Sequence, residues 1–144
     1  MPHQSPSDDM LITLDIGAQI ASANINGGQA YDMSGWDGIM FVFNVGTMAN
    51  GATFDARIVS SANANMAGNT NITNAAITQL TNASNVNAVI IDVWRPTNRY
   101  VRSATMPATA NSTFASFAIQ YRRTGTKPVT APTTTVQTVK VAQN

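Results

Sequence analysis

Residues that could carry out catalysis are few in this 144-residue chain, and their spacing matches no known active-site pattern. His3 is the only histidine, and it lies in a Pro- and Ser-rich N-terminus that we expect to be flexible. A metal site with more than one histidine ligand is therefore excluded, and a Ser-His-Asp triad would have to use this one terminal residue. The chain has no cysteine, which excludes disulfides, thiolate zinc sites and cysteine nucleophiles. It also lacks a phosphate-binding loop, a dinucleotide fingerprint and a nucleophile elbow.

The acidic residues are seven aspartates, and glutamate is absent. Two carboxylates at the right separation can hydrolyse glycosides, but these aspartates lie where structural roles are expected. Asp37 is in a Gly-Trp-Asp-Gly turn, and Asp92 lies in a predicted strand beside Trp94. No spacing resembles a calcium-binding loop. We therefore expect no enzymatic activity, no cofactor and no metal site.

The basic residues are more informative, because five of the six arginines fall in or beside the last predicted strands of the domain. Arginine is preferred where a planar, partly desolvated contact is made, as at protein interfaces. The alternative is that these arginines are solubilising charges at strand ends. The C-terminal segment adds β-branched residues that we expect to lie on a neighbouring surface. The candidate interface residues are Arg95, Arg99, Tyr100, Arg102, Arg122, Arg123, Val136, Val139 and Val141.

Low charge excludes two other classes of protein. Only 10% of the residues are charged, against about 25% in an average globular protein, and the formal net charge is +1. A nucleic-acid binder of the usual kind needs a basic field to offset phosphate charge. No segment reaches the roughly 18 consecutive apolar residues of a membrane span, and the N-terminus has no signal-peptide pattern. We expect no nucleic-acid partner and no membrane partner.

The composition predicts an all-β fold. Asn and Thr account for 33 residues, and both are poor helix formers. Strands are predicted over residues 11–16 (extending towards 21), 29–33, 38–45, 53–59, 86–95, 99–104 and 113–123. The nearly continuous apolar run 38–45 is typical of a strand in the middle of a sheet, buried on both faces. With the turn at Asn50-Gly51, the alternating run 53–59 predicts a β-hairpin with one solvent-facing side, and one helical turn is possible within 73–81.

Short strands separated by turns indicate a sandwich or barrel. We expect a flexible N-terminal segment at 1–9, a single β-sandwich domain at 10–123 and an extended C-terminal arm at 124–144. The arm begins with a Thr-, Pro- and Gly-rich stretch that has no packing period.

Four stretches resemble a family of virion proteins of tailed bacteriophages, the capsid decoration (cement) proteins. They are residues 35–47 (GWDGIMFVFNVGT), 53–61 (TFDARIVSS), 99–102 (RYVR) and 121–123 (YRR), the last followed by Pro128-Val129. The resemblance covers roughly residues 8–130, and its most specific part is Arg99-Tyr100-Val101-Arg102 with the apolar strand upstream. The chain departs from the family pattern at Pro96-Thr97-Asn98, where many relatives have Gly-Lys, and in the Asn-rich loop 62–85.

The resemblance implies a jelly-roll-like β-sandwich that is often a homotrimer. Such a protein is made in the host cytoplasm and binds the outside of the expanded phage head. There it stabilises contacts between capsomers of the major capsid protein, so the implied partners are that protein and further copies of the chain. Arg99, Tyr100 and Arg102 are the positions that mark the family. Tyr100 and Arg102 fall on one face of their strand and Val101 on the other, and the sequence leaves open which face is inward.

Three other functions fit the same composition. The chain could be a tail- or fibre-associated β-sandwich that binds a receptor or glycan, for which exposed Trp or Tyr platforms are needed. It could be a head-completion or tail protein that forms rings. A secreted adhesion module is the third, disfavoured by the absence of a signal peptide.

Overall fold

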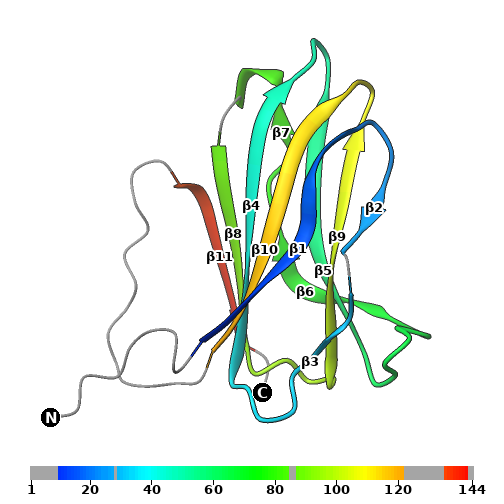
Figure 1. Ribbon diagram of the computed structural model, residues 1–144, viewed down its shortest axis with the longest axis vertical. Helices are drawn as coiled ribbons and strands as arrows, with labels where there is room; N and C mark the ends of the chain where they lie inside the picture. Colours follow the sequence, from blue (N-terminus) through cyan, green and yellow to red (C-terminus); the bar gives the residue numbers. More distant parts are fainter. Residues whose placement is uncertain (1–9, 28, 85–86, 122–134, 143–144) are drawn as a thin grey trace, which may run out of the picture.

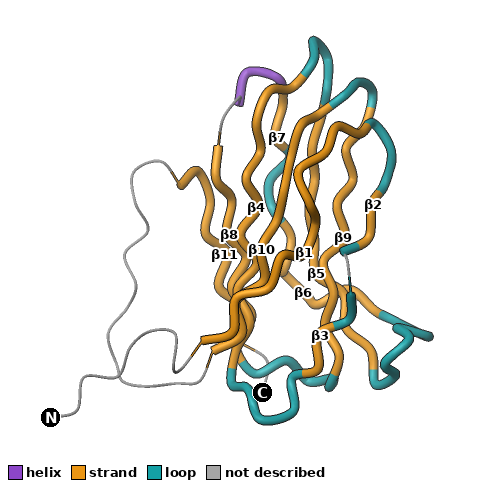
Figure 2. Tube along the Cα trace, viewed as in Figure 1, coloured by secondary structure: helices purple, strands orange, loops and turns teal. Residues whose placement is uncertain are grey.

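Two β-sheets pack face to face in the computed structural model, with the hydrophobic core between them (Figure 1). The structure describes residues 10–27, 29–84, 87–121 and 135–142. Within these residues there is no α-helix, and one short 3₁₀ turn is present (Figure 2). The all-β prediction is confirmed, and the two facing sheets are consistent with the expected sandwich.

Sheet A has five strands and sheet B has six. In spatial order, sheet A consists of β1 (Met10–Ala21), β10 (Ser112–Tyr121), β4 (Gly38–Met48), β8 (Asn87–Trp94) and β11 (Thr135–Ala142). Sheet B consists of β2 (Ile25–Asn26), β9 (Tyr100–Ala108), β5 (Thr53–Ser61) and β6 (Thr70–Ala76), with β3 (Tyr31–Asp32) also on β9 and β7 (Leu80–Thr81) also on β5. The 3₁₀ turn η1 covers Asn82–Ser84. All pairs are antiparallel except β11 with β8, which is parallel.

A chain of aromatic rings runs through the core and crosses from one sheet to the other. Tyr31, Phe41, Phe43, Phe54 and Phe114 follow one another with ring centroids 5.1–6.5 Å apart. All five side chains are buried. Each such burial contributes about 1.5–3 kcal/mol, and the tilted ring pairs add a smaller term. The aromatic residues of β4 and β5 therefore hold the two sheets together.

The predicted long strands are confirmed with small shifts of their ends, but two local predictions are wrong. β4 does lie in the middle of sheet A, between β10 and β8. The hairpin across Asn50-Gly51 does not form, because β4 belongs to sheet A and β5 to sheet B, so this connection crosses between the sheets. Phe54, Ala56 and Ile58 are buried, as the alternation predicts. Their strand, β5, pairs with β6, β7 and β9 rather than with β4. The helical turn predicted within 73–81 is also wrong, since 70–76 and 80–81 are strands that pair with β5.

Asp15 is a buried carboxylate that joins both sheets. Its side chain accepts hydrogen bonds from Tyr31 Oη (3.0 Å), from Ser116 Oγ (2.8 Å) and from Ser103 Oγ. Ser116 belongs to sheet A, whereas Tyr31 and Ser103 belong to sheet B. The residue is 5% exposed, and the one salt bridge among the described residues lies elsewhere, between Arg99 and Asp32. Three hydroxyl donors thus replace the water that this carboxylate loses on burial.

The inward position of Asp15 requires an irregularity in β1. The pairing of β1 with β10 shifts between Leu14 and Ile16 and again between Ile16 and Gln19. Asp15 and Ile16 are consecutive, and both are buried. Because side chains alternate along a regular strand, two consecutive inward residues need a bulge between them. N-terminal to the bulge, the alternation starting from Asp15 turns Ile12 and Leu14 outward, where they are exposed.

Replacing Asp15 with alanine should lower the free energy of unfolding by about 3 kcal/mol or more, because three buried hydroxyls lose their acceptor. Asp55→Ala is the matched control, since the Asp55 carboxylate accepts one exposed hydrogen bond, from Gln79 Nε2. We expect that variant to lose less than about 1 kcal/mol. Urea denaturation measures both. Equal, small losses in the two variants would show that the Asp15 network is not a main support of the fold.

Candidate interaction surfaces

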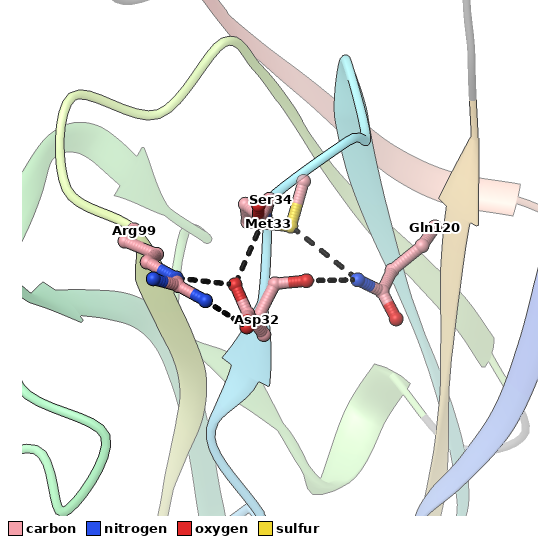
Figure 3. A network of polar contacts seen from close by, with 5 residues as sticks. All are labelled: Asp32, Met33, Ser34, Arg99 and Gln120. Atoms are coloured by element: carbon pink, nitrogen blue, oxygen red, sulfur yellow. Dashed lines mark hydrogen bonds and ion pairs between the residues drawn. The ribbon is translucent and has the colours of Figure 1, made fainter.

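Arg99 is held by Asp32 at the end of the sandwich where β3 meets β9 (Figure 3). Arg99 Nε and Nη2 donate to the two carboxylate oxygens of Asp32 at 2.9 and 2.8 Å, and the Ser34 amide donates to Oδ1 at 2.9 Å. Hydrogen bonding to Arg99, followed by that to Ser34, lowers the pKa of Asp32 to about 2. Both charged side chains are about half exposed. The pair fixes the direction of the guanidinium while leaving it accessible.

Gln120 connects this ion pair to the other sheet. From β10 of sheet A, its Nε2 donates to the Asp32 carbonyl at 2.9 Å and contacts Met33 Sδ at 3.7 Å (Figure 3). The Met33 amide in turn donates to the Arg99 carbonyl at 2.8 Å. The segment around β3 is therefore bonded to both sheets, and this segment holds Arg99, which directly precedes β9.

Tyr100 and Arg102 lie on the outer face of sheet B, because Val101 between them is fully buried. This settles which side of the strand is inward. The Arg99 guanidinium lies 5.3 Å from the centre of the Tyr100 ring, within the range of a cation–π contact. Arg102 Nε is buried and has no hydrogen-bond partner within the described part of the chain. The sequence motif thus forms a half-exposed strip of basic and aromatic groups.

Arg95 follows β8 and lies beside the outer face of sheet A. Its guanidinium is 5.5 Å from the centre of the Trp94 ring, and Trp94 stacks on Tyr121 with ring centres 6.1 Å apart. Gly38 lies between Trp94 and Tyr121 in the sheet register. A Cβ at position 38 would collide with the Tyr121 ring. A glycine is therefore needed at this point for the two aromatic rings to meet.

The remaining candidate residues are less fully placed. Arg122 and Arg123 lie outside the described residues. Val136, Val139 and Val141 are in β11, where Val139 is opposite Ile91 and Val141 opposite Val93 in the parallel register. Residues 135–142 of the expected arm thus form the edge strand of sheet A.

The structure places only some of the candidate interface residues close together. Arg95 and Arg99 lie at the same end of the sandwich, because the connection from β8 to β9 carries both (Figure 1). Arg99, Tyr100 and Arg102 form one strip on sheet B, whereas Arg95 follows the end of β8 in sheet A. Asp32, which orients Arg99, was not recognised. Nothing in the sequence links residues 67 positions apart, so only the register of β3 with β9 reveals the pair.

An apolar surface on sheet A was also not foreseen. The exposed large hydrophobic side chains of the described residues all belong to β1 and β10, and they are Met10, Leu11, Ile12, Leu14, Ile20 and Phe117. The available signal was that β1 and β10 carry apolar residues at both alternating sets of positions. A sheet with one solvated face normally shows a polar set.

A hollow of about 390 Å³ lies beside β5 and β6, lined by Asp55, Arg57, Asn71, Asn74 and Met106 among others. The Asp55 carboxylate already accepts a hydrogen bond from Gln79 Nε2 at 2.7 Å.

In the described part of the chain, no three histidine, cysteine or acidic residues group closely enough to hold a metal ion. None of the helical structure described is long and apolar enough to cross a membrane. A scan against protein-family models and a search of curated proteins each found no match for the chain.

Two tyrosines should make the fold sensitive to alkali. Burial, with the neighbouring carboxylates of Asp15 and Asp92, raises the pKa of Tyr31 and Tyr121 above the ordinary value of 10.0. The unfolded chain loses these protons as the pH rises through 10, whereas the folded chain retains them. The contribution of these two tyrosines to the free energy of unfolding is therefore fully present below pH 10. Above it, stability falls by up to about 1.4 kcal/mol per pH unit for each tyrosine.

Urea denaturation from neutral pH to about pH 11 measures this slope. Tyr121→Phe keeps the ring but removes one phenol, and we expect a shallower decline in this variant. Tyr31→Phe should act in the same direction. A slope unchanged in both variants would contradict the assignment.

The ion pair can be tested by titration. Arg99→Gln should raise the pKa of Asp32 from about 2 towards its ordinary 3.8, as measured by carboxyl carbon NMR. Arg95→Gln, which removes the same charge from the same end, should leave the Asp32 pKa in place. Because the folded-state pKa is lowered, the stabilisation is present above about pH 4 and is lost as the pH falls through about 2. An Asp32 pKa that stays near 2 in Arg99→Gln would exclude Arg99 as the main cause.

Proposed function

We propose that the chain is a capsid decoration protein, a structural virion protein that binds the outside of the expanded phage head. It stabilises contacts between capsomers of the major capsid protein, acts as a homotrimer, and has no catalytic role. The four stretches that resemble this family supply the starting point for the proposal.

The strand order supports the jelly-roll part of this proposal. β2 and β3 pair with successive parts of β9 and count as one interrupted strand. With the short β7 and the edge strand β11 set aside, the strands can be numbered one to eight in chain order. Sheet A then has the order 1-8-3-6 and sheet B the order 2-7-4-5. This order matches that of the eight-stranded double Greek key found in viral capsid proteins and lectins, which supports a jelly-roll fold for the chain.

The observation that carries the functional proposal is the convergence of three resembling stretches at one end of the sandwich. The Asp37 amide donates to the Tyr121 carbonyl at 3.1 Å, and the Arg95 amide donates to the Asp37 carbonyl at 2.8 Å. Arg99 begins the third stretch at this same end, fastened through Asp32 and Gln120. Segments distant in sequence thus place arginines and aromatic rings at one end of the sandwich, Arg95 beside Trp94 on sheet A and Arg99 beside Tyr100 on sheet B. Arginine and tyrosine are the residues enriched at the energetic centres of protein interfaces.

A low charge suits this function physically. A decoration protein stabilises the expanded shell by binding that state alone, and each occupied site contributes its binding free energy. Because many copies bind one shell, their binding free energies sum to a large stabilisation even when each single contact is weak. A net charge of +1 lets neighbouring copies approach without strong mutual repulsion.

Co-sedimentation with expanded shells built from the cognate major capsid protein tests the proposal. We expect saturable binding at a fixed stoichiometry, and decorated shells that survive heating better than bare ones. Arg102→Ala and Tyr100→Ala should each weaken binding at least tenfold, about 1.4 kcal/mol. Arg57→Ala removes an exposed charge from the neighbouring strand β5 and should have a smaller effect. Absence of binding by a folded protein would refute the decoration role.

The same topology occurs in glycan-binding proteins, so a receptor- or glycan-binding role is the second reading. Such a site needs an aromatic ring with a free face. Trp94 has Tyr121 on one side and the Arg95 guanidinium nearby, which leaves less of its ring available. Binding to a glycan array without binding to shells would favour this second reading.

A further inference from the structure

The exposed apolar side chains gather in one region of the molecule. Ile20, Ile12 and Leu14 on β1 are 66%, 63% and 57% exposed, and Phe117 on β10 is 42% exposed. The β1–β10 register places Leu14 opposite Phe117 and Ile12 opposite Ile119, all on the outer side of sheet A. We call the outward residues Met10, Ile12, Leu14, Ile20 and Phe117 the β1 patch.

The β1 patch continues across the sheet in rows. Phe117 is opposite Val42, and Val42 is opposite Ile90, so one row runs through four strands with apolar residues only. In the next row Ile119 is opposite Met40. These inner members of the rows are partly buried, so exposure is greatest towards the β1 edge. The surface is therefore continuous, and its centre lies near one edge of the sheet.

Charge is sparse in these rows, where Asp92 of β8 is opposite Met40 and is followed in the register by Lys140 of β11. The Asp92 carboxylate accepts a hydrogen bond from Tyr121 Oη. Two copies of such a face can meet without like charges opposing each other. Interfaces between identical subunits are the more apolar class of protein interface.

The chain's own segments outside the structure lack the residues to cover the patch. Residues 1–9 (MPHQSPSDD) contain one methionine and no Leu, Ile, Val or Phe. Residues 122–134 (RRTGTKPVTAPTT) contain Val129 as their largest aliphatic residue. Neither composition complements a surface of isoleucine, leucine and phenylalanine side chains.

The position of the patch at a sheet edge strengthens the case for a partner. β1 is a 12-residue edge strand with no lysine, arginine or proline, and its single charge, Asp15, points into the core. Proteins that keep such an edge in water usually place charges or proline there. The bulges after Leu14 interrupt regular pairing along this edge. Contact through side chains on the face is thus better supported than extension of the sheet along the whole strand.

We infer that the β1 patch is the surface through which copies of this chain associate. Large apolar side chains present on the order of 150–200 Å² each when fully accessible. The exposed fractions of the five side chains of the β1 patch therefore amount to roughly 400–530 Å². That lies within the roughly 300–600 Å² of the largest patch on a typical monomer, and the partly buried apolar residues of the rows extend it towards the roughly 800 Å² per partner of a stable interface. The number of copies, three, is taken from the proposed function, and on this point the inference rests on it. The three chains would have their β1 edges around one axis.

Sedimentation of the purified protein, with no shells present, tests the inference separately from shell binding. We expect a closed oligomer, with a mass of three chains, over a wide range of concentrations. Leu14→Lys places a charge at the centre of the patch and should weaken association at least tenfold, giving monomers on dilution. Thr73→Lys adds the same charge to the exposed side of β6, in sheet B, and should leave the oligomer intact.

Leu14 is more than half exposed in the single chain, so the substituted chain should still fold, and circular dichroism and thermal unfolding check this. Ile12→Ser is the second variant should Leu14→Lys misfold. A wild-type chain that is monomeric at every concentration would overturn the inference. An oligomer that persists in both folded variants would overturn it as well. If the wild type forms trimers and does not bind shells, the patch assignment stands and the decoration role fails.

Discussion

Asp15 lies where β1 changes its alternation, and its carboxylate is held by hydroxyls from both sheets rather than by a cation. Burying such a group is costly unless its oxygens are fully hydrogen-bonded. The donors Ser103, Ser116 and Tyr31 must therefore all be in place, which fixes how β9, β10 and β3 approach β1. Gly27 fits against the same group, since a Cβ there would meet Ser103 Oγ and the Asp15 carboxylate. One residue thus sets the spacing of several strands.

The same constraint determines what the molecule presents to its surroundings. If β1 alternated regularly through Ile16, then Ile12 and Leu14 would face the core and Asp15 would face solvent. The bulge brings both Asp15 and Ile16 inward and turns Ile12 and Leu14 outward. The outer side of sheet A is consequently apolar towards its β1 edge, while the outer side of sheet B carries the strip that includes Tyr100 and Arg102. Two faces of opposite character fit two different contacts, one with further copies of the chain and one with a more polar partner.

Much of the fold is predictable from local pattern, because β5 and β10 alternate with the period of a strand and β4 is a nearly continuous apolar run of strand length. The pairing of those strands is not predictable from local pattern. The sequence around Asn50-Gly51 would look the same whether the strand after the turn paired with the strand before it or joined the opposite sheet. The candidate site divides in the same way. The strip Arg99-Tyr100-Arg102 could be named from residue types, but its Asp32 partner depends on the register of β3 with β9, which has no sequence signal. Apolar residues at both alternating sets of positions in β1 and β10 indicate an apolar surface, but the bulge in β1 decides which residues form it.

Solvent accessibility of individual methyl groups tests most directly whether the outer side of sheet A is a covered surface. A soluble paramagnetic chelate broadens the methyl NMR signals that it can approach. We predict that the methyls of Ile12 and Leu14 are protected in the wild-type protein nearly as well as those of Ile39, which is fully buried in the core. In Leu14→Lys the Ile12 methyls should become accessible. Broadening of the wild-type Ile12 and Leu14 signals in proportion to their 63% and 57% exposure in a single chain would contradict the account.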